Sequence, residues 1–208
     1  MKEIRLDGFI ETFKSASKIV ITNHTNPDGD AMGSALALQQ VLEKMGKKVS
    51  VVVPNPYPKF LWHLHGNERV LIYAEGKTAG NAVIEEADMI FHLDYNAFGR
   101  SADMESALRE AKASKVMIDH HQQPEDWPDF IYSDTDMSST CQMIYEFCDM
   151  FGWLEHLDKH SAESIYTGIV TDTGSFKYSA TSSRTHEVAG RLIELGVEPH
   201  VLHGKIFD

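Results

Sequence analysis

Short apolar runs alternate with longer amphipathic stretches along most of the chain. Residues 18–22 are nearly all apolar and β-branched, which predicts a strand buried on both faces. Similar runs predict further strands at 48–53, 70–73, 89–93, 115–118, 130–133 and 176–179. Helical periodicity, Ser caps and Gly stops predict helices over 3–16, 31–45, 79–87, 104–113, 138–151, 159–170 and 182–195, and another that begins at Pro199.

Strands that alternate with helices are typical of α/β proteins. The order of these elements predicts a mainly parallel, Rossmann-like sheet with helices on both faces. A chain of 208 residues is long enough for one large domain or two small ones.

Acidic and histidine side chains follow the predicted strands at the point where each strand ends. Parallel sheets bind ligands beyond these carboxyl ends, near a switch in strand order, so we expect the side chains to lie together. The strand-end residues are His24, Asp28, Asp30, Asp94, Asp119, His120 and His121. Asp172, at the end of a predicted helix, is grouped with them on its sequence context alone.

This set of side chains is suited to divalent metal ions. Carboxylates and imidazoles without cysteine favour Mn²⁺, Mg²⁺, Co²⁺ or Fe²⁺ over a structural zinc ion. A two-metal site of this kind suits displacement at phosphorus. Taken singly, the residues have plainer interpretations, namely helix caps, turns, a surface or buried histidine pair, or a calcium-type Asp-x-Asp loop. Their joint placement favours the metal site.

Other catalytic systems lack their motifs in this sequence. There is no Gly-x-Ser-x-Gly, no Walker A loop and no Gly-x-Gly-x-x-Gly. The net charge of −12 argues against binding long duplex nucleic acid through a broad basic face. A short nucleotide held by metal ions remains compatible with that charge.

Cysteine usage and hydropathy indicate a reduced compartment. Cys141 and Cys148 are two helical turns apart, about 10 Å along a predicted helix, which excludes a disulfide between them and leaves small buried side chains. Residues 1–5 lack a signal peptide's apolar segment, and no apolar run reaches the ~20 residues of a membrane span. We therefore expect a cytoplasmic protein without a membrane partner.

Four motifs in order give the chain a family resemblance. They are HTNPDGDA at 24–31, Asp94, DHH at 119–121 and TDTGSF at 171–176. Over essentially its whole length the chain resembles the DHH phosphoesterase superfamily, and within it the nanoRNase/pAp phosphatase (bifunctional oligoribonuclease) group. The resemblance implies a cytoplasmic, Mn²⁺-dependent 3′–5′ exoribonuclease and phosphatase. Its substrates would be very short oligonucleotides or the nucleoside bisphosphate 3′-phosphoadenosine 5′-phosphate.

The resemblance also implies a ligand set for two divalent ions. One ion would be held by His24, Asp28 and Asp94, and the second by Asp30, Asp94, His120 and Asp172. Asp94 would therefore bridge the pair, and a water between the ions would be the nucleophile. His121 would face the phosphate as a hydrogen-bond donor or general acid, and Asp119 would orient the histidines.

Three further residues are candidates for substrate contact. Ser139 and Thr140, at a predicted helix start, would offer N–H and hydroxyl donors to phosphate, with a plain helix cap as the alternative. Arg184 would approach the substrate, against the plainer interpretation of a solvated helix face.

One departure from the family pattern concerns the end of the chain. Members of this group continue into a DHHA1-type substrate domain with a Gly-Gly-Gly-His-type motif, which does not occur here. We expect 1–196 to be the DHH catalytic domain and 197–208 the start of a linker helix, with the second domain absent. Metal binding should survive, nucleotide activity should be weak or absent, and uncovered apolar surface would favour association, for example as a homodimer.

Two other functions stay open from the sequence. A related member of the superfamily would hydrolyse a cyclic dinucleotide or pyrophosphate. A domain of another class would bind metal, be inert alone and serve as an interaction module.

Overall fold

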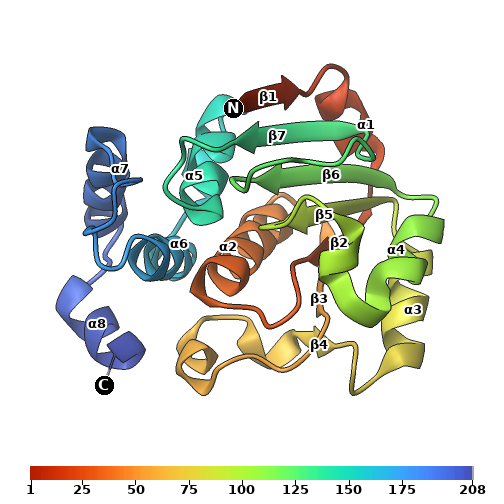
Figure 1. The fold of residues 1–208 in the computed structure, drawn as a ribbon, viewed down its shortest axis with the longest axis horizontal. Helices are drawn as coiled ribbons and strands as arrows, with labels where there is room; N and C mark the ends of the chain where they lie inside the picture. The colour runs from red at the N-terminus through yellow and green to blue at the C-terminus, as the bar shows by residue number, and fades with distance from the viewer. Residues whose placement is uncertain (208) are drawn as a thin grey trace.

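A seven-stranded sheet runs through the centre of the computed structural model, which describes residues 1–207 (Figure 1). Its strands are β1 (Lys2–Arg5), β2 (Lys18–Thr22), β3 (Lys48–Val53), β4 (Leu71–Ile72), β5 (Met89–Leu93), β6 (Ser114–Asp119) and β7 (Phe130–Asp134). They lie in the order β1-β7-β6-β5-β2-β3-β4. Every neighbouring pair is parallel except β1 and β7. The predicted α/β fold with a mainly parallel sheet is confirmed.

Helices cover both faces of this sheet, as the sequence predicts (Figure 1). The α-helices are α1 (Phe9–Ser15), α2 (Gly29–Lys44), α3 (Lys77–Glu85), α4 (Glu105–Glu110), α5 (Thr140–Met150), α6 (Lys159–Asp172), α7 (Ser183–Glu194) and α8 (Pro199–Phe207). Short 3₁₀ segments are η1 (Lys59–His63), η2 (Asn67–Arg69), η3 (Phe98–Met104) and η4 (Leu154–His156). Helices α1, α2 and α5 share the larger hydrophobic core, whereas α3 and α4 share the smaller one.

The alternation of side chains along β2 explains why this strand is apolar throughout. Ile19 and Ile21 point into the larger core, and Val20 between them points into the smaller core. A strand covered on both faces has no position for a solvated side chain, which is why the run has almost no polar residue.

Two predicted elements are wrong. The N-terminal part of the helix predicted over 3–16 is strand β1, which pairs antiparallel with β7, and only Phe9–Ser15 is helical. Backbone pairing with β7 at the open edge of the sheet holds these residues extended, and Ile4, expected on the apolar side of a helix, is 44% exposed in the strand. The strand predicted at 176–179 is a turn, because both Lys177 and Tyr178 donate backbone N–H bonds to the Thr173 carbonyl.

The helix predicted from Pro199 is confirmed as α8. Its Leu202 and Ile206 are buried, and the helix packs on α6 and η1 (Figure 1). Asp208, the last residue of the predicted linker segment, lies outside the described residues. Both cysteines are buried and unpaired, as expected. Among residues 1–207 we find no helix of the length and hydropathy that crossing a bilayer requires.

Strand order places a switch point between β2 and β5. From β2 the chain extends the sheet through β3 and β4, and it then returns to build β5, β6 and β7 on the other side. Loops that leave the carboxyl ends of β2 and β5 therefore diverge, which opens space at that edge.

Candidate metal centre

Five segments deliver the predicted ligands to this edge of the sheet. They are the loop after β2, the start of α2, the loop after β5, the end of β6 and the last residue of α6. Three overlapping groups of ligand atoms result, each with all its atoms within 4.8 Å of one another: His24, Asp28 and Asp94; Asp30, His120 and Asp172; and Asp94, His120 and His121. The structure thus brings together every residue of the predicted ligand set.

The first group lies where β2 meets α2. His24 Nε2 is 3.2 Å from Asp94 Oδ2 and 4.0 Å from Asp28 Oδ2. Asp28 is also the N-cap of α2, because its Oδ1 accepts the N–H groups of Asp30 and Ala31 at 3.0 Å. The helix-cap interpretation of Asp28 is therefore confirmed through one oxygen. Its other oxygen faces His24, and its role as a metal ligand stays a prediction.

The second group surrounds His120. Its Nε2 lies 3.7 Å from Asp30 Oδ2, 3.6 Å from Asp94 Oδ1 and 3.5 Å from Asp172 Oδ2. Ligands bound to one ion at ~2.1 Å are about 3.0–3.4 Å apart. The observed separations are close to that spacing, and the N/O donor set suits a divalent ion, so these residues fit a metal.

Asp94 faces both His24 and His120 through different oxygens. Oδ2 faces His24, whereas Oδ1 faces His120 and accepts a hydrogen bond from Thr140 Oγ1 at 2.9 Å. Its backbone is left-handed (φ 63°), a conformation that Asp tolerates better than most residues and that often marks functional sites. This turn directly after β5 aims the carboxylate between the two groups.

Backbone carbonyls hold the rings of His24 and His120 through their Nδ1 atoms. Nδ1 of His24 donates to the Thr25 carbonyl at 2.8 Å, and Nδ1 of His120 faces the Met137 carbonyl at 3.3 Å. A backbone carbonyl on Nδ1 leaves Nε2 free for a metal, which is the usual arrangement of ligand histidines.

Asp119 contacts only one of the two histidines that follow it. Its Oδ1 lies 2.7 Å from His121 Nδ1, and its Oδ2 accepts the His121 backbone N–H at 3.0 Å. The expectation that Asp119 orients both histidines therefore needs correction, because the Met137 carbonyl is the partner of His120.

The carboxylate of Asp30, a residue of α2, lies against the N-terminus of α5. Its carboxylate accepts the backbone N–H groups of Thr140 at 2.6 Å and Cys141 at 2.7 Å. The positive end of a helix offsets a buried negative charge, so α5 stabilises this carboxylate in the site. Sequence reasoning missed this contact, since only the N-cap at Ser139 had a recognisable signal.

A close crossing of α2, α5 and α6 makes room for Asp30. A Cβ added at Gly168 would lie 2.1 Å from Cys141 Sγ and 2.8 Å from Asp30 Oδ1. The absence of a side chain at Gly168 therefore lets α6 approach Asp30. The close approach also brings Asp172, at the end of α6, within 3.5 Å of His120.

The loop that carries His121 is held by residues that sequence analysis did not single out. Asn96 Nδ2 donates to the carbonyls of His121 at 3.3 Å and Gln122 at 3.0 Å. Trp127 Nε1 in turn donates to the Asn96 carbonyl at 3.2 Å. Asn96 is two residues beyond Asp94, a proximity that is the one sequence signal for its role.

The three candidate substrate contacts have partners within the protein. Ser139 is the N-cap of α5 and accepts the Gln142 N–H, and the Thr140 hydroxyl donates to Asp94. Arg184, on α7, donates two hydrogen bonds to the carboxylate of Glu146 on α5, at 2.8 and 2.9 Å.

Burial and mutual repulsion perturb the acids of the site. Burial, reinforced by the charges of Asp94 and Asp172, raises the pKa of Asp30 well above its usual range. Burial likewise raises the pKa of Asp172 to about 6, with Asp94 and Asp28 adding to the effect and His120 opposing it. For Asp94, burial is outweighed by the hydrogen bond with His24 and by the neighbouring histidines, so its pKa is lowered. Divalent cations would relieve this repulsion.

The raised pKa of Asp172 predicts a pH dependence of the metal-free protein. Its folded-state pKa of about 6 exceeds the unfolded value of about 3.9, so the stabilising protonated form is complete below about pH 4 and lost as pH rises through about 6. In chelator, the free energy of unfolding should therefore fall more steeply from about pH 5 to 7 in wild type than in Asp172→Asn. Urea unfolding at both pH values measures this, and equal slopes would contradict it.

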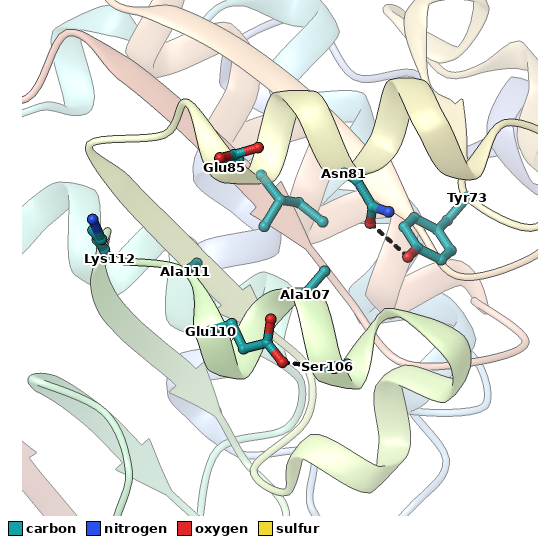
Figure 2. A pocket seen from close by; sticks show the side chains of 9 residues that line it. Tyr73, Asn81, Glu85, Ser106, Ala107, Glu110, Ala111 and Lys112 are labelled. Carbon is teal, nitrogen blue, oxygen red and sulfur yellow. Dashed lines mark hydrogen bonds between the residues drawn. The ribbon is translucent and has the colours of Figure 1, made fainter.

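A cavity of about 550 Å³ lies elsewhere, between α3 and α4 (Figure 2). Its walls include Glu85, Glu110 and Lys112, and Tyr73 donates to Asn81 at 2.6 Å at one end. None of its lining residues belongs to the ligand groups, so this cavity has no part in the chemistry of the site.

Comparisons with known proteins cover most of this chain. The model of the DHH family, N-terminal domain, matches residues 18–169. The bifunctional oligoribonuclease and PAP phosphatase NrnA of Bacillus subtilis is 29% identical over 96% of this chain and 60% of that protein. The cyclic-di-AMP phosphodiesterase PdeA of Listeria monocytogenes is 26% identical over 90% of this chain and 29% of its own length.

A solved structure has nearly the same fold. The crystal structure of an exopolyphosphatase-related protein from Bacteroides fragilis superposes with a TM-score of 0.95 at 36% identity. The match covers 97% of this chain and 59% of the other. The chain thus spans about 60% of the length of the relatives NrnA and the Bacteroides protein.

Proposed function

This chain belongs to the DHH family, and from that premise we propose that it hydrolyses phosphate esters with the help of divalent metal ions. The observation that supports this most directly is Asp94, whose two carboxylate oxygens face two separate ligand groups. A carboxylate shared in this way is what a pair of ions needs in order to act on one phosphorus atom.

Two ions, of which Mn²⁺ is our first candidate, would be held by the groups described above. His24, Asp28 and Asp94 would hold one, and Asp30, Asp94, His120 and Asp172 the other. When bound, such ions neutralise phosphoryl oxygens and lower the pKa of water enough for attack at phosphorus. The carboxylates would hold the ions, and the backbone carbonyls of Thr25 and Met137 hold the rings of His24 and His120 in place.

His121 is the proposed proton donor to the leaving oxygen. Its hydrogen bond with Asp119, together with the charges of Asp119 and Asp94, raises its pKa above the usual value. A raised pKa increases the fraction of His121 that carries a proton, and this proton could pass to the developing alkoxide. Asp119 holds the ring through Nδ1, so that Nε2 is the atom which would face the substrate.

The proposed substrates are short oligonucleotides or 3′-phosphoadenosine 5′-phosphate. Relatives such as NrnA, an oligoribonuclease and PAP phosphatase, support this choice, and the net charge of −12 favours small anions held by metal over long duplexes. The relative PdeA, a cyclic-di-AMP phosphodiesterase, makes a cyclic dinucleotide the second candidate. Two unpaired cysteines support action in the cytoplasm.

A substrate panel tests the proposal. The protein with Mn²⁺ should release mononucleotide from a dinucleotide, or phosphate from the nucleoside bisphosphate, faster than it cleaves a cyclic dinucleotide or pyrophosphate. Chromatography of the products measures each rate, and chelator should abolish all of them. Turnover of none of the four, both by this chain and by a version extended with a DHHA1-type domain, would overturn the enzyme proposal and leave a metal-binding module.

A further inference from the structure

Arg100 is the arginine that has no carboxylate partner within the described residues. The other five each pair with an acid at 2.7–2.9 Å: Arg5, Arg69, Arg109, Arg184 and Arg191. Arg100 is half-buried, and its guanidinium donates no hydrogen bond to any residue of 1–207. In a chain with 31 acidic and 19 basic residues, an unpaired guanidinium of this kind is unexpected.

The backbone fixes Arg100 beside the metal groups. Its carbonyl accepts the N–H of Thr25, the residue after His24, at 2.7 Å. Its own N–H donates to the Ala97 carbonyl at 3.0 Å, within the short segment that begins at Asp94. Arg100 therefore joins the two loops that supply His24 and Asp94, and both of its backbone groups are anchored.

The same segment also contacts the loop of His121. Asn96, between Asp94 and Arg100, donates to the His121 backbone carbonyl at 3.3 Å. Arg100 therefore brings a positive charge to the segment that borders a site whose ligand groups contain four carboxylates.

We propose that Arg100 binds phosphoryl oxygens of the substrate, an inference that rests on the proposed phosphoesterase function. A planar guanidinium forms two parallel charge-assisted hydrogen bonds with a phosphate, and this guanidinium is free to do so. It would hold the phosphate against the metal pair beside His121. The ligand class is a phosphate monoester or diester, and the residue acts by binding rather than by proton transfer.

Arg100→Gln and Arg100→Lys test the role in catalysis. With Mn²⁺ and the dinucleotide or nucleoside bisphosphate, Arg100→Gln should raise KM by about 10- to 100-fold with a smaller change in kcat, because a charge-assisted contact is lost. Arg100→Lys should recover part of the loss, and Mn²⁺ content should not change. Arg191→Gln, at an exposed arginine paired with Glu194, is the matched control and should behave as wild type.

Inorganic phosphate separates this inference from the enzyme proposal. Calorimetric titration of phosphate into the Mn²⁺-loaded protein needs no turnover, and Arg100→Gln should weaken binding by a similar factor. If wild type binds phosphate through Arg100 but neither it nor the extended version cleaves any substrate, the enzyme proposal fails and the binding role stands. If Arg100→Gln matches Arg191→Gln in both measurements, or wild type does not bind phosphate, the binding role is overturned. Should Arg100→Gln fail to fold, the same comparisons apply to Arg100→Lys.

Discussion

Asp94→Asn should reduce hydrolysis by about 10³-fold or more and lower the amount of bound Mn²⁺. Each oxygen of Asp94 faces a different ligand group, so one substitution removes a ligand from both. Losses of this size are typical when a group that organises the transition state is removed. A substitution at a residue serving one ion alone would leave the second ion in place.

Asparagine is the informative replacement because of the backbone at this position. Asp94 has a φ of 63°, a left-handed conformation that Asn adopts readily and Ala does not. Asn also keeps the shape of the side chain, including an oxygen that can accept from Thr140. A loss of activity in Asp94→Asn therefore reports on charge and metal binding rather than on a distorted loop.

Metal analysis and initial rates at saturating Mn²⁺ measure the effect. Asp126→Asn is the matched control, because Asp126 is exposed and pairs with Arg5 away from the site. Urea unfolding should show that both variants fold. Unchanged metal content in Asp94→Asn would contradict the bridging role.

Gly168→Ala should destabilise the fold by about 1–3 kcal/mol, although alanine is the better helix former. The new Cβ would lie 2.1 Å from Cys141 Sγ and 2.8 Å from Asp30 Oδ1. Cys141 is fully buried, so relief must come from a shift of α5 or α6. Either shift disturbs the Asp30 carboxylate, so we also expect Mn²⁺ affinity to fall by about tenfold or more.

Gly190→Ala provides the control for this prediction. Gly190 lies in α7, and a Cβ there would meet nothing within 4 Å. That variant should be neutral or stabilised by up to about 1 kcal/mol, with unchanged Mn²⁺ affinity. Comparison of the two free energies of unfolding and the two Mn²⁺ titrations isolates the close crossing. A Gly168→Ala protein as stable as Gly190→Ala would show that the crossing tolerates a methyl group.

Much of the site could be predicted because parallel sheets place strand ends together. His24, Asp94 and His120 each follow a run with the composition of a buried strand, so their convergence follows from fold class alone. The strand runs themselves were recognisable because burial on both faces excludes polar residues. The resemblance assigns the residues to two ions, an assignment that stays a prediction, and the structure brings the same residues together in three overlapping groups.

The rest depends on contacts between segments far apart in the chain. Thr140 donates to Asp94 across 46 positions, and Cys141 to Asp30 across 111, and neither pairing has a local signature. The same limit applies to β1. The helical pattern around Phe9 continues back into residues 3–5, but these residues pair with β7. A local pattern cannot report a partner that only the tertiary structure supplies.

The two edges of the sheet bear on how this chain can associate. One edge is β1, where Lys2, Glu3 and Arg5 are exposed and charged, and the other is β4, which has two residues. Charged or very short edge strands resist pairing with the strands of another molecule, so these edges protect the protein from aggregation through its sheet. Any homodimer would therefore have to form through side-chain surfaces, and a continuous intermolecular sheet is disfavoured.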